Sequence, residues 1–123
     1  MLGTITALLA GGIAGVLARW LVVLGVSGLL GAWVPWGTLT VNLSGCLLIG
    51  FFDAAASKRG FGGPHARALL MTGFCGAYTT FSALILELDV LLRAAPLRGA
   101  AYVLVSVAAG LTLFRAGAVL GGR

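Results

Sequence analysis

Four long apolar runs constrain the fold of this chain more than any other feature. They cover roughly residues 2–26, 37–56, 66–92 and 99–120, and most charged residues lie near their ends. A helix that crosses the hydrocarbon core of a bilayer needs about 20 predominantly apolar residues. Each run is long enough for one crossing. The sequence therefore predicts an all-α membrane protein with four transmembrane helices, in which residues 1–123 form a single four-span unit.

The composition agrees with burial in lipid. Hydrophobic residues make up 60% of the chain and charged residues only 9%, whereas charged residues make up roughly a quarter of a typical soluble domain. The net charge of +5 does not indicate nucleic-acid binding, because the sequence has no basic stripe interleaved with aromatic residues. The basic residues instead lie at the ends of apolar runs, where they anchor helices to lipid headgroups.

The basic residues give a weak indication of membrane orientation. With four spans, both termini lie on the same side as the 57–67 loop. The bias is five against three: Lys58, Arg59, Arg67, Arg115 and Arg123 against Arg19, Arg93 and Arg98. This favours cytoplasmic termini, but a protein that inserts in both orientations would show the same weak bias.

The reactive side chains do not form an enzyme's constellation. The chain has one histidine, His65, and three scattered carboxylates, with no nucleophile–base arrangement. Cys46 and Cys75 both lie inside apolar runs, where we expect small buried side chains rather than zinc ligands. The sequence therefore predicts that the protein is not an enzyme.

The first run combines a packing motif with an unusual charge. Gly11, Gly15 and Arg19 recur every four residues and share one helix face. The Gly-x-x-x-Gly spacing lets another helix backbone approach closely. An arginine inside a span usually faces protein or a wet cavity. Arg19 is then either an anchor that snorkels to the interface or a positive charge that attracts anions into a vestibule.

Polar residues also line faces of the second and fourth runs. Thr38, Asn42 and Gly45 or Cys46 share one face of the second, and Tyr102, Ser106 and Gly110 form a thin stripe on the fourth. A buried amide without partners is costly. Asn42 either bonds to another helix or donates its NH2 group to a passing ion.

The third run contains the densest cluster of residues that disfavour a helix. Between Gly73 and Ser82 lie two glycines, two β-branched threonines and a serine. We expect a helix break at mid-membrane, which is tolerated only where it is buried in protein or lines a cavity. Its freed backbone groups either coordinate ions or are satisfied by packing neighbours. Glu87 and Asp89, further along, are expected to be wet and interfacial.

Together these motifs resemble those of the Fluc (CrcB-type) fluoride channel family. The segments that carry the resemblance are Gly11–Trp20, Gly37–Gly50 and Gly73–Ser82, and they occur in the family's order and spacing over essentially the whole chain. The resemblance implies an antiparallel, dual-topology dimer with two fluoride pores in the cytoplasmic membrane. It also implies a structural sodium ion at the dimer centre, held by the backbone carbonyls of Gly76 and Thr79.

The resemblance also assigns residues to the pore. Arg19 corresponds to an arginine near the vestibule and Glu87 to a glutamate beyond the break. The expected fluoride pore contains Asn42, Phe81, Thr38, Ser82, Tyr102, Ser106 and Leu84. Two positions depart from the family pattern, because Leu84 stands where a second phenylalanine is usual and Gly110 where a second serine is usual. The chain is then either a homodimer with an altered pore or half of a heterodimer with a homologous chain.

Fluoride conduction fits the chemistry of these residues. Fluoride is small and strongly hydrated, so a pore must replace its water with an amide, hydroxyls and the positive edge of an aromatic ring. We expect passive export that gives fluoride resistance. A small multidrug-type proton-coupled antiporter would need a carboxylate in the first span, which has only Arg19. A non-transporting membrane scaffold would explain the Gly-x-x-x-Gly motif but not the broken third span.

Overall fold

The computed structural model describes every residue except Ala32 and Phe61, and the side chain of Arg59 is also left undescribed. The helices, in chain order, are α1 (Leu2–Leu30), α2 (Trp36–Arg59), α3 (Pro64–Arg67), η1 (Ala68–Cys75), α4 (Gly76–Tyr78), α5 (Phe81–Ala94) and α6 (Pro96–Gly121). Within this described part, four helical stretches are long and apolar enough to cross a membrane: Leu2–Leu30, Trp36–Lys58, Pro64–Ala94 and Pro96–Gly121. The predicted four-span, all-α membrane protein is confirmed.

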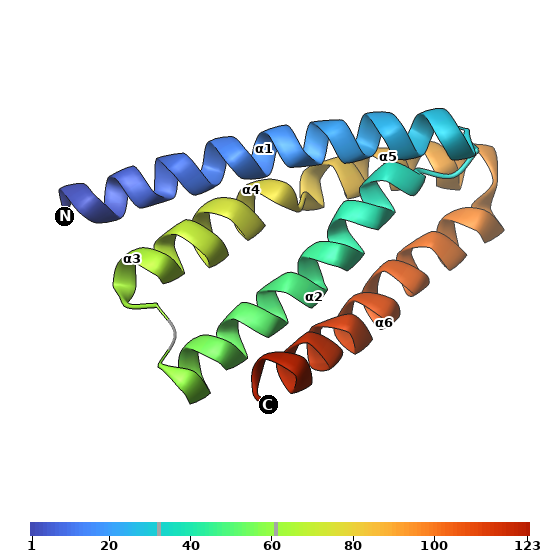
Figure 1. The fold of residues 1–123 in the computed structure, drawn as a ribbon. Coiled ribbons are helices and arrows are strands. Elements are labelled where there is room, and N and C mark those ends of the chain that lie inside the picture. Colours follow the sequence, from blue (N-terminus) through green and yellow to red (C-terminus); the bar gives the residue numbers. More distant parts are fainter. Residues whose placement is uncertain (32, 61) are drawn as a thin grey trace.

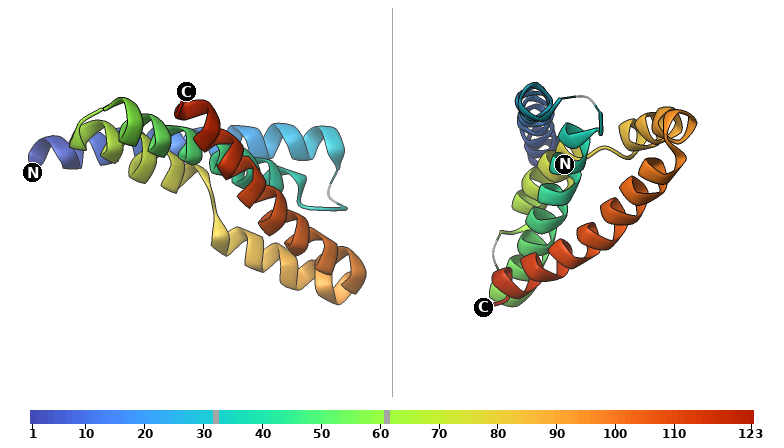
Figure 2. Two further views of the ribbon diagram at one scale, coloured as in Figure 1. Left: turned by 90° about the horizontal axis from the view of Figure 1, so that it is seen from below. Right: turned by 90° about the vertical axis from the view of Figure 1, so that its right-hand side faces the viewer.

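The four spans run alternately from one end of the molecule to the other (Figure 1). The N terminus, α3 and the C terminus lie toward one end, and the connections from α1 to α2 and from α5 to α6 lie at the opposite end. Viewed end-on in Figure 2, α5 and the start of α6 diverge from α1 and α2. The first span is longer than expected, because it continues to Leu30 and includes Ser27 and Gly28.

Glycines on α1 allow it to pack directly on the third span. A Cβ atom on Gly11 would collide with the backbone carbonyl of Leu69, and one on Gly15 would collide with that of Phe74. Both glycines are buried. The Gly-x-x-x-Gly motif therefore brings two backbones together, as predicted.

A second set of glycines joins α2 to α6. A Cβ atom on Gly117 would meet the Leu47 carbonyl, and one on Gly121 would meet the Phe51 carbonyl. From the other side, Gly50 packs against the backbone of Phe114. These close approaches hold α6 against α2 near the C terminus. The start of α6 and α5 lie at the opposite end of the molecule, where they diverge from α2 (Figure 2).

The third span is interrupted between Tyr78 and Phe81, as the sequence predicted. Thr79 and Thr80 both adopt extended backbone conformations, with φ/ψ of −86°/160° and −150°/118°. The preceding segment η1 is a π-helix of eight residues, which the sequence analysis did not predict. Most π-helices are single-turn bulges inside α-helices, and their extra residue leaves no distinct pattern in composition.

Candidate functional site

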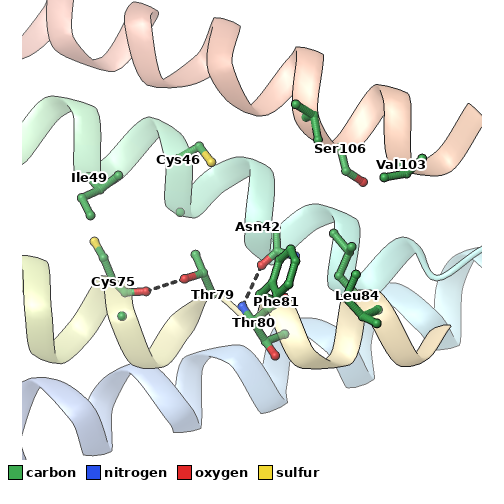
Figure 3. Close-up of a pocket in the computed structure, with 14 residues that line it drawn as sticks. Asn42, Cys46, Ile49, Cys75, Thr79, Thr80, Phe81, Leu84, Val103 and Ser106 are labelled. Atoms are coloured by element: carbon green, nitrogen blue, oxygen red, sulfur yellow. Dashed lines mark hydrogen bonds between the residues drawn. The ribbon is translucent and has the colours of Figure 1, made fainter. Parts of the chain in front are cut away.

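A groove of about 450 Å³ lies beside the break in the third span. Its walls come from α2, the ends of η1 and α4, the break, α5 and α6 (Figure 3). The residues that line it are Asn42, Gly45, Cys46, Ile49, Cys75, Gly76, Thr79, Thr80, Phe81, Leu84, Ile85, Val103, Ser106 and Val107. The groove brings together four of the seven residues expected in the pore, namely Asn42, Phe81, Leu84 and Ser106. Gly76 and Thr79, expected to hold sodium, lie on it too. Thr38, Ser82 and Tyr102 do not line it.

The side-chain amide of Asn42 is paired with the backbone of the break. Its Oδ1 accepts a hydrogen bond from the Thr80 N–H at 2.8 Å, and its Nδ2 donates to the Thr80 carbonyl at 3.0 Å. Both peptide groups of an extended residue are thus satisfied by one side chain from α2. Since an amide nitrogen carries two hydrogens, one N–H of Asn42 remains for another acceptor.

Other side chains cap the ends of the two half-helices. The hydroxyl of Thr80 accepts a hydrogen bond from the Ala83 N–H at 3.3 Å and so caps α5. The hydroxyl of Thr79 donates to the Cys75 carbonyl at 2.9 Å. Arg19, half-buried on α1, reaches the Thr79 carbonyl at 3.4 Å. The guanidinium of Arg19 therefore contacts the protein backbone at the break.

The two positions that bracket the first turn of α5 differ sharply in exposure. Phe81 is 76% exposed, whereas Leu84 is 8% exposed. Leu84 packs in a small core with Leu39 and Tyr102. The Phe81 ring is thus mostly uncovered, while the Leu84 side chain packs α5 against α2 and α6.

A second polar cluster lies one helical turn from Asn42 on α2. The buried Thr38 hydroxyl donates to Glu87 Oε1 at 2.8 Å, and the Tyr102 hydroxyl donates to Glu87 Oε2 at 3.4 Å. Glu87 was expected to be wet and interfacial. Its half-buried carboxylate accepts hydrogen bonds from these two hydroxyls, between three helices. Asp89 is exposed and pairs with Arg93 at 3.0 Å, as an interfacial residue would.

The remaining expected pore residues are placed less centrally. The Ser106 hydroxyl lies on the groove but donates to the Tyr102 carbonyl of its own helix at 2.7 Å. Ser82 is exposed, with its hydroxyl 3.4 Å from that of Thr80. The sequence analysis did not select Thr80 for the site, although it stands in the Thr79–Thr80 pair that indicated the break. It also missed a hydrogen bond of 2.9 Å between Ser44 and Tyr78.

Glu87 also lines a second groove, of about 630 Å³, at the end of the molecule where α5 meets α6. Arg98 and Trp33 lie at this groove, and the Arg98 guanidinium stacks on the Trp33 ring with 6.0 Å to the ring centroid. Such cation–π contacts are favourable at exposed sites.

The chain matches the family model described as "CrcB-like protein, Camphor Resistance (CrcB)" over residues 6–118. It belongs to the CrcB-like family. A relative from Hahella chejuensis is 43% identical over 111 residues, covering 89% of this chain and 87% of the relative. One from Chlorobaculum tepidum is 44% identical over 112 residues, 90% of this chain and 88% of the relative. One from Chlorobium phaeobacteroides is 49% identical over 84 residues, 68% of this chain and 65% of the relative. All three relatives are named "Fluoride-specific ion channel FluC".

Proposed function

We propose that this member of the CrcB-like family is the subunit of a fluoride channel that exports fluoride passively across the cytoplasmic membrane. The observation that carries the proposal is the broken third span. It places a side-chain amide, an aromatic ring and the first turn of a helix on one groove within the membrane-spanning region. The activity is transport down a gradient and involves no catalysis.

The groove offers donors suited to a small anion. α5 begins at Phe81, and the N-terminal end of a helix carries a partial positive charge and free N–H groups. The second N–H of Asn42 and the edge of the Phe81 ring add further positive surface. The wall around them is apolar, with Ile49, Ile85 and Val107 lining it. Because these few donors are set in an apolar wall, they favour an anion small enough to approach all the donors at once.

A second copy of the chain would complete this site. Phe81 is 76% exposed and the groove is open along one side, so one chain does not enclose an ion. We propose an antiparallel homodimer with dual topology. The weak basic bias of the loops is compatible with insertion of the chain in both orientations. A heterodimer with a homologous chain is the alternative, and Leu84 is the residue that motivates it.

The residues of the break fit a sodium ion held by carbonyls. Among the residues that the structure describes, no group of three or more His, Cys, Asp or Glu side chains could hold a metal, so a cation would need backbone oxygens. In an unbroken α-helix the carbonyls of Gly76 and Thr79 would accept from Thr80 and Ala83. Those two N–H groups instead donate to Asn42 and to the Thr80 hydroxyl. The Thr79 carbonyl also accepts from the Arg19 guanidinium at 3.4 Å, so a cation would share or displace that contact. When bound, sodium would hold the two copies together electrostatically.

The alternatives gain no support from the site. A proton-coupled antiporter would need a titratable carboxylate in α1, and residues 2–30 contain no Asp or Glu. A scaffold would need the glycine packing of α1 but no groove beside a break. We keep neither as a second function.

Reconstitution of the purified chain alone into liposomes tests the proposal. We expect fluoride to leave loaded vesicles down its gradient, with chloride retained and with no dependence on a pH gradient. Empty vesicles and vesicles with a denatured sample are the controls. Flux that requires a proton gradient, or equal flux of chloride, would refute a fluoride channel.

A further inference from the structure

Besides offering an N–H to an anion, Asn42 fixes the backbone of the break through two hydrogen bonds to Thr80. Its amide bonds to both the N–H and the carbonyl of Thr80, at 2.8 and 3.0 Å, an arrangement that we call the Asn42–Thr80 clasp. The extended backbone of Thr79 and Thr80 turns the Thr80 N–H away from the Gly76 carbonyl, to which it would donate in a continuous helix, and the bond to Asn42 holds it in that position. The clasp therefore keeps the Gly76 carbonyl free.

The freed carbonyl lies on an open surface. Gly76 is exposed, and the nearest atom to a Cβ built on it is the Met71 carbonyl oxygen at 3.9 Å. Gly76 also lines the groove that contains Asn42. A second chain or a cation can approach the Gly76 carbonyl at this open position and replace the helical partner that it has lost.

We infer that Asn42 is a positioning residue for the cation site: it never touches the cation, but it withholds the Thr80 N–H from the Gly76 carbonyl and so presents that oxygen to sodium. The inference rests on the proposed sodium site. It predicts that the acceptor half of the Asn42 amide, rather than its donor half, controls cation binding. Anion donation would depend on the donor half alone.

Gly45 makes the clasp possible. It stands one turn beyond Asn42 on the same face of α2, and a Cβ atom there would collide with the Thr79 Cγ2 methyl. The absence of a side chain at Gly45 lets α2 approach the break closely enough for the Asn42 amide to reach Thr80. Gly45 and Asn42 therefore act as one unit.

The test measures cation binding directly, on the full chain in lipid nanodiscs. Carbonyl-labelled glycine combined with nitrogen-labelled alanine restricts the carbonyl spectrum to Gly–Ala pairs, of which the chain has four: Gly31–Ala32, Gly76–Ala77, Gly99–Ala100 and Gly117–Ala118. Sodium is titrated against a large organic cation as control, and the sodium concentration at the midpoint of the Gly76 carbonyl shift is recorded.

Three variants separate the two halves of the amide. We expect Asn42→Ala to raise the sodium midpoint by roughly tenfold, since the released Thr80 N–H then competes for the Gly76 carbonyl. Asn42→Asp loses the donor to the Thr80 carbonyl but keeps an acceptor for the Thr80 N–H. Because its negative charge also attracts a cation, its sodium midpoint should not exceed about threefold that of the wild type. Gly45→Ala should resemble Asn42→Ala, and Gly45→Ala combined with Thr79→Ser, which lacks the colliding methyl group, should restore the wild-type midpoint.

Gly25→Ala is the matched control, because a Cβ atom there meets nothing within 4 Å, and its sodium midpoint should not change. An unchanged midpoint in Asn42→Ala would overturn the inference, as would equal weakening in Asn42→Ala and Asn42→Asp. A wild-type Gly76 carbonyl that ignores sodium would remove the cation site and the role assigned to Asn42. Liposome flux reports on the channel proposal separately, so the two failures are distinguishable.

Discussion

Two polar clusters on α2 satisfy their hydrogen bonds by opposite means. Thr38 and Tyr102 both donate to Glu87, so this cluster is made of side chains alone and the helices around it are intact. Asn42, one turn further along, meets only the backbone of Thr80, where the helix is broken. The first cluster joins three continuous helices, whereas the second replaces hydrogen bonds that a helix has lost.

This difference predicts which substitutions each cluster tolerates. A side-chain cluster keeps part of its bonding when one member changes, because the others can rotate. A backbone break offers fixed N–H and carbonyl groups in a fixed geometry, and only a side chain with an acceptor and a donor side by side matches both. Asn42 should therefore be far less replaceable than Thr38.

The largest predicted effect is on fluoride flux in liposomes, which should fall much more for a change at Asn42 than for a change at Thr38. In Asn42→Asp the carboxylate has no donor for fluoride and repels it, so we expect flux in liposomes to fall to the background of empty vesicles. Thr38→Val keeps the size of the side chain and leaves Tyr102 to bond Glu87, so flux should fall only severalfold. Normal flux through Asn42→Asp would mean that the residue only packs helices together.

The next effect concerns the stability of the side-chain cluster. Glu87→Ala leaves the hydroxyls of Thr38 and Tyr102 without their acceptor, and we expect a loss of about 2 kcal/mol in the free energy of unfolding. Glu87→Gln keeps one carbonyl acceptor and should lose about half as much. Thermal unfolding in detergent measures both, with Asp89→Asn, at an exposed ion pair, as the control. Equal losses in all three variants would contradict a specific cluster.

The smallest effect is expected at Leu84, where the side-chain core meets the groove. We expect the wild-type chain alone to conduct, with flux below that of Leu84→Phe, because a ring edge adds about 1 kcal/mol of favourable contact, or roughly fivefold. The larger ring must also fit beside Leu39 and Tyr102, which should cost about 1–3 kcal/mol of stability.

Reconstitution of the wild type and Leu84→Phe at equal protein, together with thermal unfolding, checks both expectations. Flux that appears only when a second homologous chain is added would show that Leu84 marks a subunit of a heterodimer, contrary to this prediction.

The sequence predicted the spans and the position of the break because both depend on local composition. Runs of apolar residues define the spans, and the glycines and threonines between Gly73 and Thr80 disfavour a helix. The partner of each polar side chain depends on tertiary packing. For Asn42 the sequence left open a helix contact or an ion contact, and the bonded partner is the backbone of Thr80.

Glu87 and Leu84 show the limit of sequence reasoning most clearly. Charge and proximity to the end of a span suggested that Glu87 was wet, and gave no sign that Thr38 and Tyr102 converge on it from two other helices. Leu84 was expected in the pore, and it is 8% exposed and packs with Leu39 and Tyr102. Neither outcome can be read from spacing along one helix.

The π-helix η1 has a consequence for how the third span tolerates changes in length. A π-turn contains one more residue than the α-turn that it replaces. The segment between α3 and Gly73 is therefore longer than an α-helix over the same distance would be. Deletion of Leu70 should therefore be absorbed by conversion to an α-turn, with Gly73 still packed on α1 and the break unmoved. The same deletion in α6, between the contacts of Gly110 and Gly117, has no surplus residue to consume and should misalign the helix. Natural variation in span length among relatives would then concentrate in η1.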